Sequence, residues 1–241
     1  MVTGASRGLG RAIALALAEA GADVAVAARS KKDLEETAQG VERAGRRALV
    51  VPTDVSRYEE VEALMARTRG ELGRLDVVVN NAGVAKVAPF VEMTSADWRF
   101  MLDVNLTGVF NGCRAAAPHL IAQKSGKVIN LASVVGQVGL PGYTIYSATK
   151  GGVIALTRTL GVEWARHGIQ VNAIAPGWFA TDMTGEAFAD PKLGERLTRD
   201  IPMRRIGRPA EIGPLAVYLA SAASDFMTGQ TLFLDGGHSA A

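Results

Sequence analysis

The chain has 241 residues, of which 48% are hydrophobic and 21% are charged, which fits one α/β domain with a large core. Its 26 basic and 24 acidic residues leave a net charge of +2, and no run of Lys and Arg is long enough to indicate nucleic-acid binding. A single cysteine, Cys113, excludes an intrachain disulfide, and the three histidines show no metal-ligand spacing, so we expect no metal site. Without a signal peptide or a membrane-spanning apolar run, we expect a cytoplasmic protein with no membrane partner.

The first motif in the chain is TGASRGLG, which runs from Thr3 directly into an alanine-rich helical pattern. Glycines allow tight turns and close backbone approach to a phosphate, and a helix N-terminus offers free N–H groups to an anion. Only Met1 and Val2 precede this motif, so we expect either a first strand shortened to about residues 1–3 or residues missing ahead of it. The residues expected to bind the pyrophosphate are Gly4, Ser6, Arg7, Gly8, Leu9 and Gly10.

Short apolar blocks alternate with helical patterns along the rest of the chain. We expect strands at residues 23–28, 47–54, 75–83, 127–133, 169–177 and 231–234. We expect helices at residues 30–45, 56–73, 95–122 and 146–167, and one beginning near Pro209, with Ser30 and Ser56 as side-chain caps of the first two. Strands that are apolar on both faces are typical of a parallel sheet covered by helices. The pattern predicts one Rossmann-type, doubly wound α/β domain over residues 1–241, with a mostly parallel sheet.

One long excursion interrupts this alternation, at residues 177–208. Excursions of this length in a compact domain are usually functional, so we expect a substrate lid here. Its apolar side chains suit an apolar ketone at least as well as a sugar acid, and they equally suit core packing; they are Trp178, Phe179, Met183 and Phe188.

The end of the second expected strand indicates which cofactor is bound. An NAD-selective site places a carboxylate there for the ribose 2′-hydroxyl, whereas this chain has Ala28, Arg29 and Ser30. Arg29 is suited to a 2′-phosphate, and Arg7 is within reach of the same group, although both also suit a solvated surface. We therefore expect NADP(H) to be preferred over NAD(H), with Arg29 and Ser30 at the phosphate.

Polar residues also follow the next two expected strands. Asp54 and Val55 would lie at the adenine edge, although a turn or cap role fits Asp54 about as well. The segment NNAG places Asn80, Ala82 and Gly83 where the strand order of such a sheet reverses. We expect these residues to contact the cofactor.

The reacting groups are predicted from spacing. Tyr146 and Lys150 lie four residues apart on one helix face, and Ser133 ends the preceding strand. An ammonium about 4 Å from the phenol is expected to lower its pKa by about three units, which would make Tyr146 a general acid/base. Ser133 would hydrogen-bond a carbonyl oxygen, so the set predicts hydride transfer between a ketone and a secondary alcohol. A non-catalytic dinucleotide-binding regulator on the same fold remains the alternative of a different class.

Together, TGASRGLG, NNAG, Ser133, YSATK and PGWFAT resemble the short-chain dehydrogenase/reductases over essentially the whole chain, as far as TGQTLFLDGG. The chain is most similar to the bacterial branch with 3-oxoacyl-carrier-protein reductases, gluconate 5-dehydrogenase-like enzymes and carbonyl reductases. The resemblance implies Asn105 as a fourth catalytic residue that distorts its helix and holds a water. It implies that Tyr146 and Lys150 also contact the cofactor, with Pro176, Gly177 and Thr181 on its nicotinamide side.

The same resemblance implies a homo-oligomer, and it raises the question of whether a carrier protein docks beside the site. Members of the family are usually homotetramers or homodimers, joined through helices that correspond to residues 95–122 and 146–167 and through the strand at residues 231–234. We expect a tetramer. Carrier-protein reductases carry basic residues beside the entrance, for which Lys127 and Arg166 are candidates, although ordinary surface charge is the favoured interpretation of both.

Overall fold

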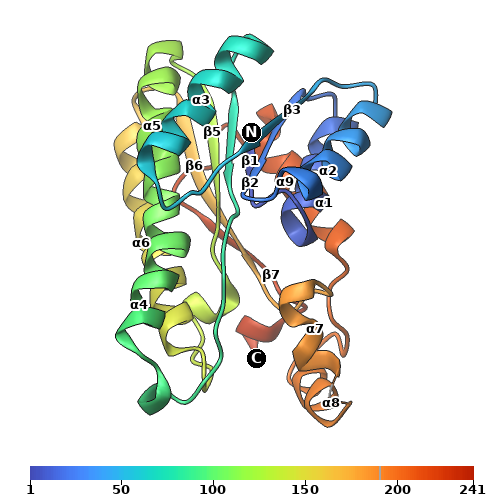
Figure 1. Ribbon diagram of the computed structural model, residues 1–241. Helices are drawn as coiled ribbons and strands as arrows, with labels where there is room; N and C mark the ends of the chain where they lie inside the picture. The colour runs from blue at the N-terminus through green and yellow to red at the C-terminus, as the bar shows by residue number, and fades with distance from the viewer. Residues whose placement is uncertain (190) are drawn as a thin grey trace.

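Within residues 1–189 and 191–241, which the computed structural model describes, seven strands form one sheet in the order β3-β2-β1-β4-β5-β6-β7. Every neighbouring pair is parallel, and the strand order reverses between β1 and β4, so the predicted doubly wound sheet is confirmed (Figure 1). The strands are β1 Val2–Thr3, β2 Val24–Ala28, β3 Ala48–Pro52, β4 Val77–Asn80, β5 Gly126–Leu131, β6 Ile169–Pro176 and β7 Thr231–Leu234.

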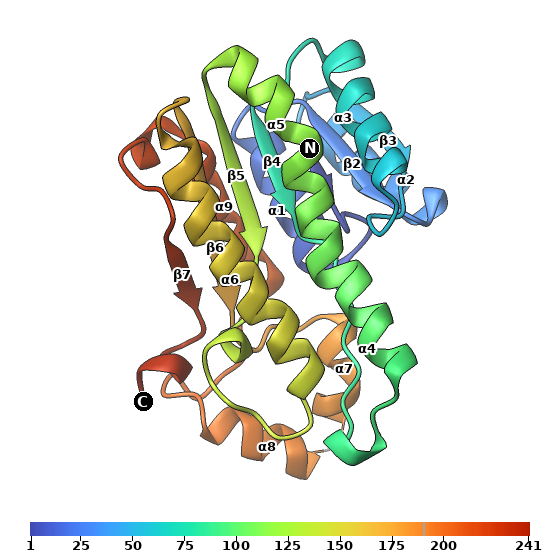
Figure 2. The same ribbon diagram turned by 90° about the vertical axis from the view of Figure 1, so that its left-hand side faces the viewer.

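Helices cover both faces of this sheet (Figures 1 and 2). One core cluster joins the sheet to α3 Tyr58–Leu72, α5 Gly108–Gln123 and α6 Thr144–Ala165. The other joins it to α1 Gly8–Glu19, α2 Lys31–Arg43 and α9 Gly213–Ala220. Three further helices, α4 Ser95–Leu102, α7 Asp182–Ala189 and α8 Pro191–Arg199, lie beyond the carboxyl ends of the central strands (Figure 2). Side chains of residues 186–193 are not described, so the apolar role expected of Phe188 lies outside the described residues.

The first strand has only two residues, Val2 and Thr3, and both predicted alternatives for it stand. Val2 pairs with Val26 of β2 and with Val79 of β4. The backbone on either side of β1 continues the ladder, because the Val79 N–H donates to the Met1 carbonyl (2.9 Å) and the Ala5 N–H to the Ala27 carbonyl (3.1 Å). The backbone from Met1 to Ala5 therefore places the glycine loop at the centre of the sheet.

One expectation about the helices is wrong. Ser56 does not cap α3, which begins at Tyr58, because its hydroxyl instead donates to the Asp54 carboxylate (2.7 Å), a charge-assisted hydrogen bond. The helical stretch expected at residues 95–122 is present, with a π-helical turn at Asp103–Thr107 between α4 and α5. By contrast, the Ser30 side chain accepts from the Asp33 N–H as predicted (3.4 Å).

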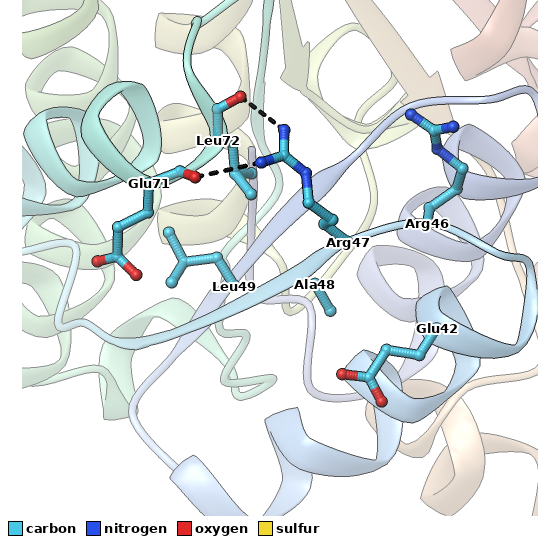
Figure 3. A pocket seen from close by; sticks show the side chains of 7 residues that line it. All are labelled: Glu42, Arg46, Arg47, Ala48, Leu49, Glu71 and Leu72. Carbon is cyan, nitrogen blue, oxygen red and sulfur yellow. Dashed lines mark hydrogen bonds between the residues drawn. The ribbon is translucent and has the colours of Figure 1, made fainter.

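A hollow of about 430 Å³ lies beside the start of β3, at the opposite edge of the sheet from the carboxyl strand ends. Figure 3 shows Arg47 reaching across it to the carbonyl oxygens of Leu72 (2.9 Å) and Glu71 (3.4 Å) at the end of α3. A cation that satisfies the last carbonyls of a helix stabilises that helix end. We therefore interpret this hollow as structural, and the chemistry as belonging to the other edge of the sheet.

Candidate active site

The glycine loop connects β1 to α1. It has no room for a side chain at Gly4 or Gly10. Gly4 and Gly8 adopt positive φ angles of 62° and 55°. A Cβ on Gly4 would lie 2.8 Å from the Ala82 Cα, and a Cβ on Gly10 would collide with the Gly4 carbonyl oxygen and the Asn81 amide. No side chain caps the start of α1, so its first N–H groups are available to bind an anion. This cradle fits the pyrophosphate of a dinucleotide.

A side chain that the sequence interpretation left out, Asn81, holds this loop in place. Its amide donates to the carbonyls of Thr3 (2.8 Å) and Gly4 (3.1 Å), while the Thr3 hydroxyl accepts from the backbone N–H of Asn81 (3.0 Å) and Ala82 (3.1 Å). Neighbouring residues at a strand end face opposite ways, but the sequence does not tell which of the two asparagines faces the loop.

The side chain of Asn80, expected to contact the cofactor, instead points into the core. It is buried and donates to the Asn130 side chain (2.9 Å) and to the Cys113 sulfur (3.5 Å). Burial raises the pKa of the Cys113 thiol to about 12, so this thiol is not a reactive thiolate near neutral pH. Asn80 therefore joins β4 to β5 and α5, and its side chain is not part of the cofactor surface.

Arg29 and Arg7 differ in what they contact. Arg29 is exposed just beyond β2 and has no hydrogen bond or ion pair among the described residues. Arg7 already pairs with Asp182 at the start of α7 (3.3 Å), with both side chains exposed. Asp54 accepts from the Ser56 hydroxyl and N–H, which lower its pKa, with a smaller contribution from the charge of Arg29. Asp54 thus has the turn role, whereas Arg29 is available to a ligand.

The structure brings Ser133, Tyr146 and Lys150 together, as their spacing predicts. Ser133 follows β5, and its hydroxyl accepts from the Val135 N–H (3.4 Å). Tyr146 and Lys150 lie one turn apart on α6, and the Lys150 Nζ is 5.6 Å from the centre of the Tyr146 ring. The Lys150 ammonium is buried and donates to the Leu131 carbonyl at the end of β5 (2.6 Å).

The predicted lowering of the Tyr146 pKa is wrong for the protein in this structure. Burial raises the pKa of Tyr146 to about 12, against a smaller opposing effect of its hydrogen bond with Ser133. Burial also lowers the pKa of Lys150 to about 8. The ammonium is directed at the Leu131 carbonyl and not at the phenol oxygen, so desolvation outweighs its attraction for a phenolate.

Asn105 occupies the π-helical turn and is fully buried. Its Oδ1 accepts from the Val84 N–H (2.8 Å), and its Nδ2 donates to the Val84 carbonyl (2.8 Å) and the Thr149 hydroxyl (3.2 Å). A Cβ on Gly83 would lie 3.4 Å from Asn105 Oδ1 and 3.6 Å from Lys150 Nζ. The helix distortion implied by the resemblance is therefore present, and Asn105 clamps the segment after β4 against α6.

The segment after β6 lies above the glycine loop. Pro176 ends β6, and a Cβ on Gly177 would lie 2.7 Å from the Asp235 Cβ, so glycine is required by close packing. The Thr181 methyl is 3.5 Å from where a Cβ on Gly8 would be. Of the expected nicotinamide-side residues, Thr181 is therefore positioned next to the phosphate cradle.

Other predicted residues have structural contacts. Val55 is buried, and its carbonyl accepts from the Asn111 amide (2.9 Å). Phe179 is a core side chain, in agreement with the packing alternative. Lys127 is buried and pairs with Asp225 (2.6 Å), so the favoured interpretation of it as ordinary surface charge is wrong, and it is not free to dock a carrier protein either.

The sequence matches known proteins over nearly its whole length. A family model described as enoyl-(acyl carrier protein) reductase matches residues 4–239. A 3-oxoacyl-[acyl-carrier-protein] reductase of Staphylococcus aureus strain Mu50 is 43% identical over 238 residues, which cover 98% of this chain and 96% of that protein.

Solved structures of related proteins also match this chain over nearly its whole length. A gluconate 5-dehydrogenase from Burkholderia cenocepacia J2315, in complex with NADP and tartrate, is 39% identical, with a TM-score of 0.95 over 99% of this chain and 94% of that one. A short-chain type dehydrogenase/reductase from Mycobacterium marinum is 38% identical, with a TM-score of 0.95 over 100% of this chain and 94% of that one. The chain belongs to the short-chain dehydrogenase/reductase family and is an NAD(P)-dependent oxidoreductase that acts on alcohol and ketone groups.

Proposed function

We propose that this protein is a carbonyl reductase that prefers NADP(H) and interconverts a ketone and a secondary alcohol with Tyr146 as general acid/base. The observation that carries the proposal is the convergence of Ser133, Tyr146 and Lys150 beside the glycine cradle. We further propose one domain over residues 1–241, with residues 177–208 as its substrate lid.

Each residue has a role that its contacts support. The cofactor, when bound, supplies or accepts the hydride. The Ser133 hydroxyl orients the carbonyl oxygen, and Tyr146, whose raised pKa keeps it protonated near neutral pH, gives that oxygen its proton. Lys150 is fixed by the Leu131 carbonyl, where its positive charge stabilises the phenolate that remains. Asn105 positions the segment after β4 and, through Thr149, the catalytic turn of α6.

The preference for NADP(H) depends on Arg29. We expect Arg29→Ala to raise the KM for NADPH by about tenfold or more and to leave the KM for NADH nearly unchanged, because only NADPH carries the 2′-phosphate. Initial rates with both cofactors would measure this. Arg57→Ala is a matched control, because Arg57 is an exposed arginine already paired with Glu60. Equal effects of Arg29→Ala on both cofactors would contradict the phosphate role.

Two narrower substrate assignments remain alternatives. A 3-oxoacyl-carrier-protein reductase is favoured by the identity to the staphylococcal enzyme, and a sugar-acid dehydrogenase by the likeness to the gluconate 5-dehydrogenase. With Lys127 engaged by Asp225, only Arg166 is left of the two basic residues considered as candidates for docking a carrier protein. A non-catalytic regulator is less favoured, since a sensor has no use for an acid/base pair.

We also propose a cytoplasmic homotetramer, with a homodimer as the alternative. Phe100 of α4, Phe110 of α5 and Val162 of α6 are exposed, which supports burial of these helices against a second copy. No helix in the described part of the chain is long and apolar enough to cross a membrane. Light scattering after size-exclusion chromatography is expected to give about four times the monomer mass of 25.3 kDa. A monomer at micromolar concentration would refute the assembly.

A further inference from the structure

Two aromatic side chains that the catalytic cycle does not use stand next to Tyr146. The ring of Tyr143 lies 6.3 Å from the Tyr146 ring at 67°, and 6.0 Å from the Trp178 ring at 83°, so both contacts are edge to face. Tyr143 immediately precedes α6, and Trp178 follows Gly177 at the base of the proposed lid. Both side chains are partly exposed, so they form an aromatic corner open toward a substrate at Tyr146.

Apolar side chains continue from this corner along the segments that surround it. Val87 lies against the turn before Tyr143, since the Ala88 N–H donates to the Gly142 carbonyl (3.2 Å). Met203, after α8, lines a cavity together with Trp178, and Met183 lies on α7 in the proposed lid. Val87, Met183 and Met203 each expose more than half of their surface. Apolar side chains clustered in the open at a binding site indicate an apolar ligand.

Two cations next to the corner, Lys86 and Arg205, are already neutralised. Lys86, on the segment that carries Val87, pairs with Asp97 (2.7 Å). A cavity of about 200 Å³ adjoins Trp178, and the arginine that lines it, Arg205, binds Glu211 through two hydrogen bonds (2.9 and 2.8 Å). These ion pairs hold the pKa values of both Asp97 and Glu211 at about 2. Both carboxylates therefore stay charged, and an anionic substrate would have to displace them.

The same cavity has one further carboxylate, that of Asp235. It accepts the backbone N–H groups of Gly237 (3.0 Å) and Ser239 (2.8 Å), and, against the opposing effect of burial, a side-chain hydrogen bond from Ser239 and the neighbouring His238 also lower its pKa. Its remaining wall is apolar and includes Phe179, Met203 and Leu234. Among the described residues that line the cavity or the segment with Val87, negative charge therefore exceeds positive charge. This excess of negative charge disfavours binding of a sugar acid. The carboxylate of a sugar acid needs a cation, and its hydroxyls lose water on binding.

We infer that the substrate is an uncharged ketone with its carbonyl in or beside an alicyclic ring, and that Tyr143 and Trp178 are the specificity-determining residues that hold this ring. This inference rests on the proposed function and narrows it. An apolar ring packs against the two aromatic side chains while its carbonyl oxygen reaches Ser133 and Tyr146. A flexible acyclic chain fills such a corner less completely and loses more conformational freedom on binding.

The first experiment compares three ketones with the purified wild-type enzyme and NADPH: 2-decalone, 5-keto-D-gluconate and the 3-oxobutanoyl thioester of N-acetylcysteamine. We expect kcat/KM for 2-decalone to exceed that for 5-keto-D-gluconate by about 100-fold and that for the thioester by about tenfold. Faster turnover of either of the other two would overturn the ring assignment and leave the oxidoreductase function standing. If an enzyme that binds NADPH reduces none of the three, both proposals are wrong.

The second experiment tests the two aromatic residues directly. We expect Trp178→Ala and Tyr143→Ala each to raise the KM for 2-decalone by about tenfold with little change in kcat, while Trp178→Phe and Tyr143→Phe, which keep a ring, restore most of the affinity. With butanone, which has no ring, the KM is expected to be the same in all variants. Tyr218→Ala, on α9 across the sheet, is the matched control and should leave both substrates unaffected. Equal losses with decalone and butanone would overturn the inference, because they would indicate a merely structural role.

Discussion

Tyr146→Phe is expected to lower kcat by about 10²- to 10⁴-fold, the contribution that a positioned general acid makes to a rate. The substitution removes only the phenol oxygen, so the ring contacts with Tyr143 and the Lys150 ammonium stay in place. The thermal midpoint and the dissociation constant for NADPH should therefore change little. Stopped-flow absorbance of NADPH with a ketone substrate measures the rate, and NADPH fluorescence measures binding.

The control for this variant is Tyr218→Phe, which removes a phenol oxygen from α9, on the other face of the sheet. It should leave kcat unchanged. If Tyr146→Phe reduces a ketone as fast as the wild type, Tyr146 is not the acid. If the wild type binds NADPH but no ketone or alcohol is ever turned over, the alternative of a dinucleotide-binding regulator replaces the proposed function.

The pKa of Tyr146 also bears on the direction of the reaction. A phenol with a pKa of about 12 is protonated throughout the physiological range, which suits it to give a proton during ketone reduction. Alcohol oxidation needs a phenolate, and here the buried Lys150 charge and the positive charge of an oxidised nicotinamide ring both act to lower the pKa. The phenol is therefore in the protonated form that ketone reduction needs at neutral pH.

The sequence predicts those parts of the site that depend on local chemistry. The positive φ angles at Gly4 and Gly8 and the shared helix face of Tyr146 and Lys150 depend on neighbours in the chain, so spacing alone identifies them. The parallel sheet is likewise predictable, because strands apolar on both faces need helices on both sides.

Features that depend on distant partners could not be predicted in this way. Asp182, which engages Arg7, is 175 residues away in sequence, and no local pattern connects them. The Leu131 carbonyl that receives the Lys150 ammonium is a backbone group, which leaves no residue signature. The expected effect of Lys150 on Tyr146 failed for that reason: spacing places two side chains near one another but does not fix where each one points.

Gly10→Ala is expected to weaken NADPH binding by about tenfold or more and to lower the free energy of unfolding by about 1–3 kcal/mol. The added methyl would collide with the Gly4 carbonyl oxygen and the Asn81 amide, which are held against β4 and cannot move without opening the loop. Gly70→Ala is a matched control on α3, where an added Cβ meets nothing within 4 Å. Because alanine favours a helix, Gly70→Ala should raise the thermal midpoint by about 1–3 °C and leave NADPH binding unchanged. If Gly10→Ala binds NADPH as tightly as the wild type, the loop is not the pyrophosphate site.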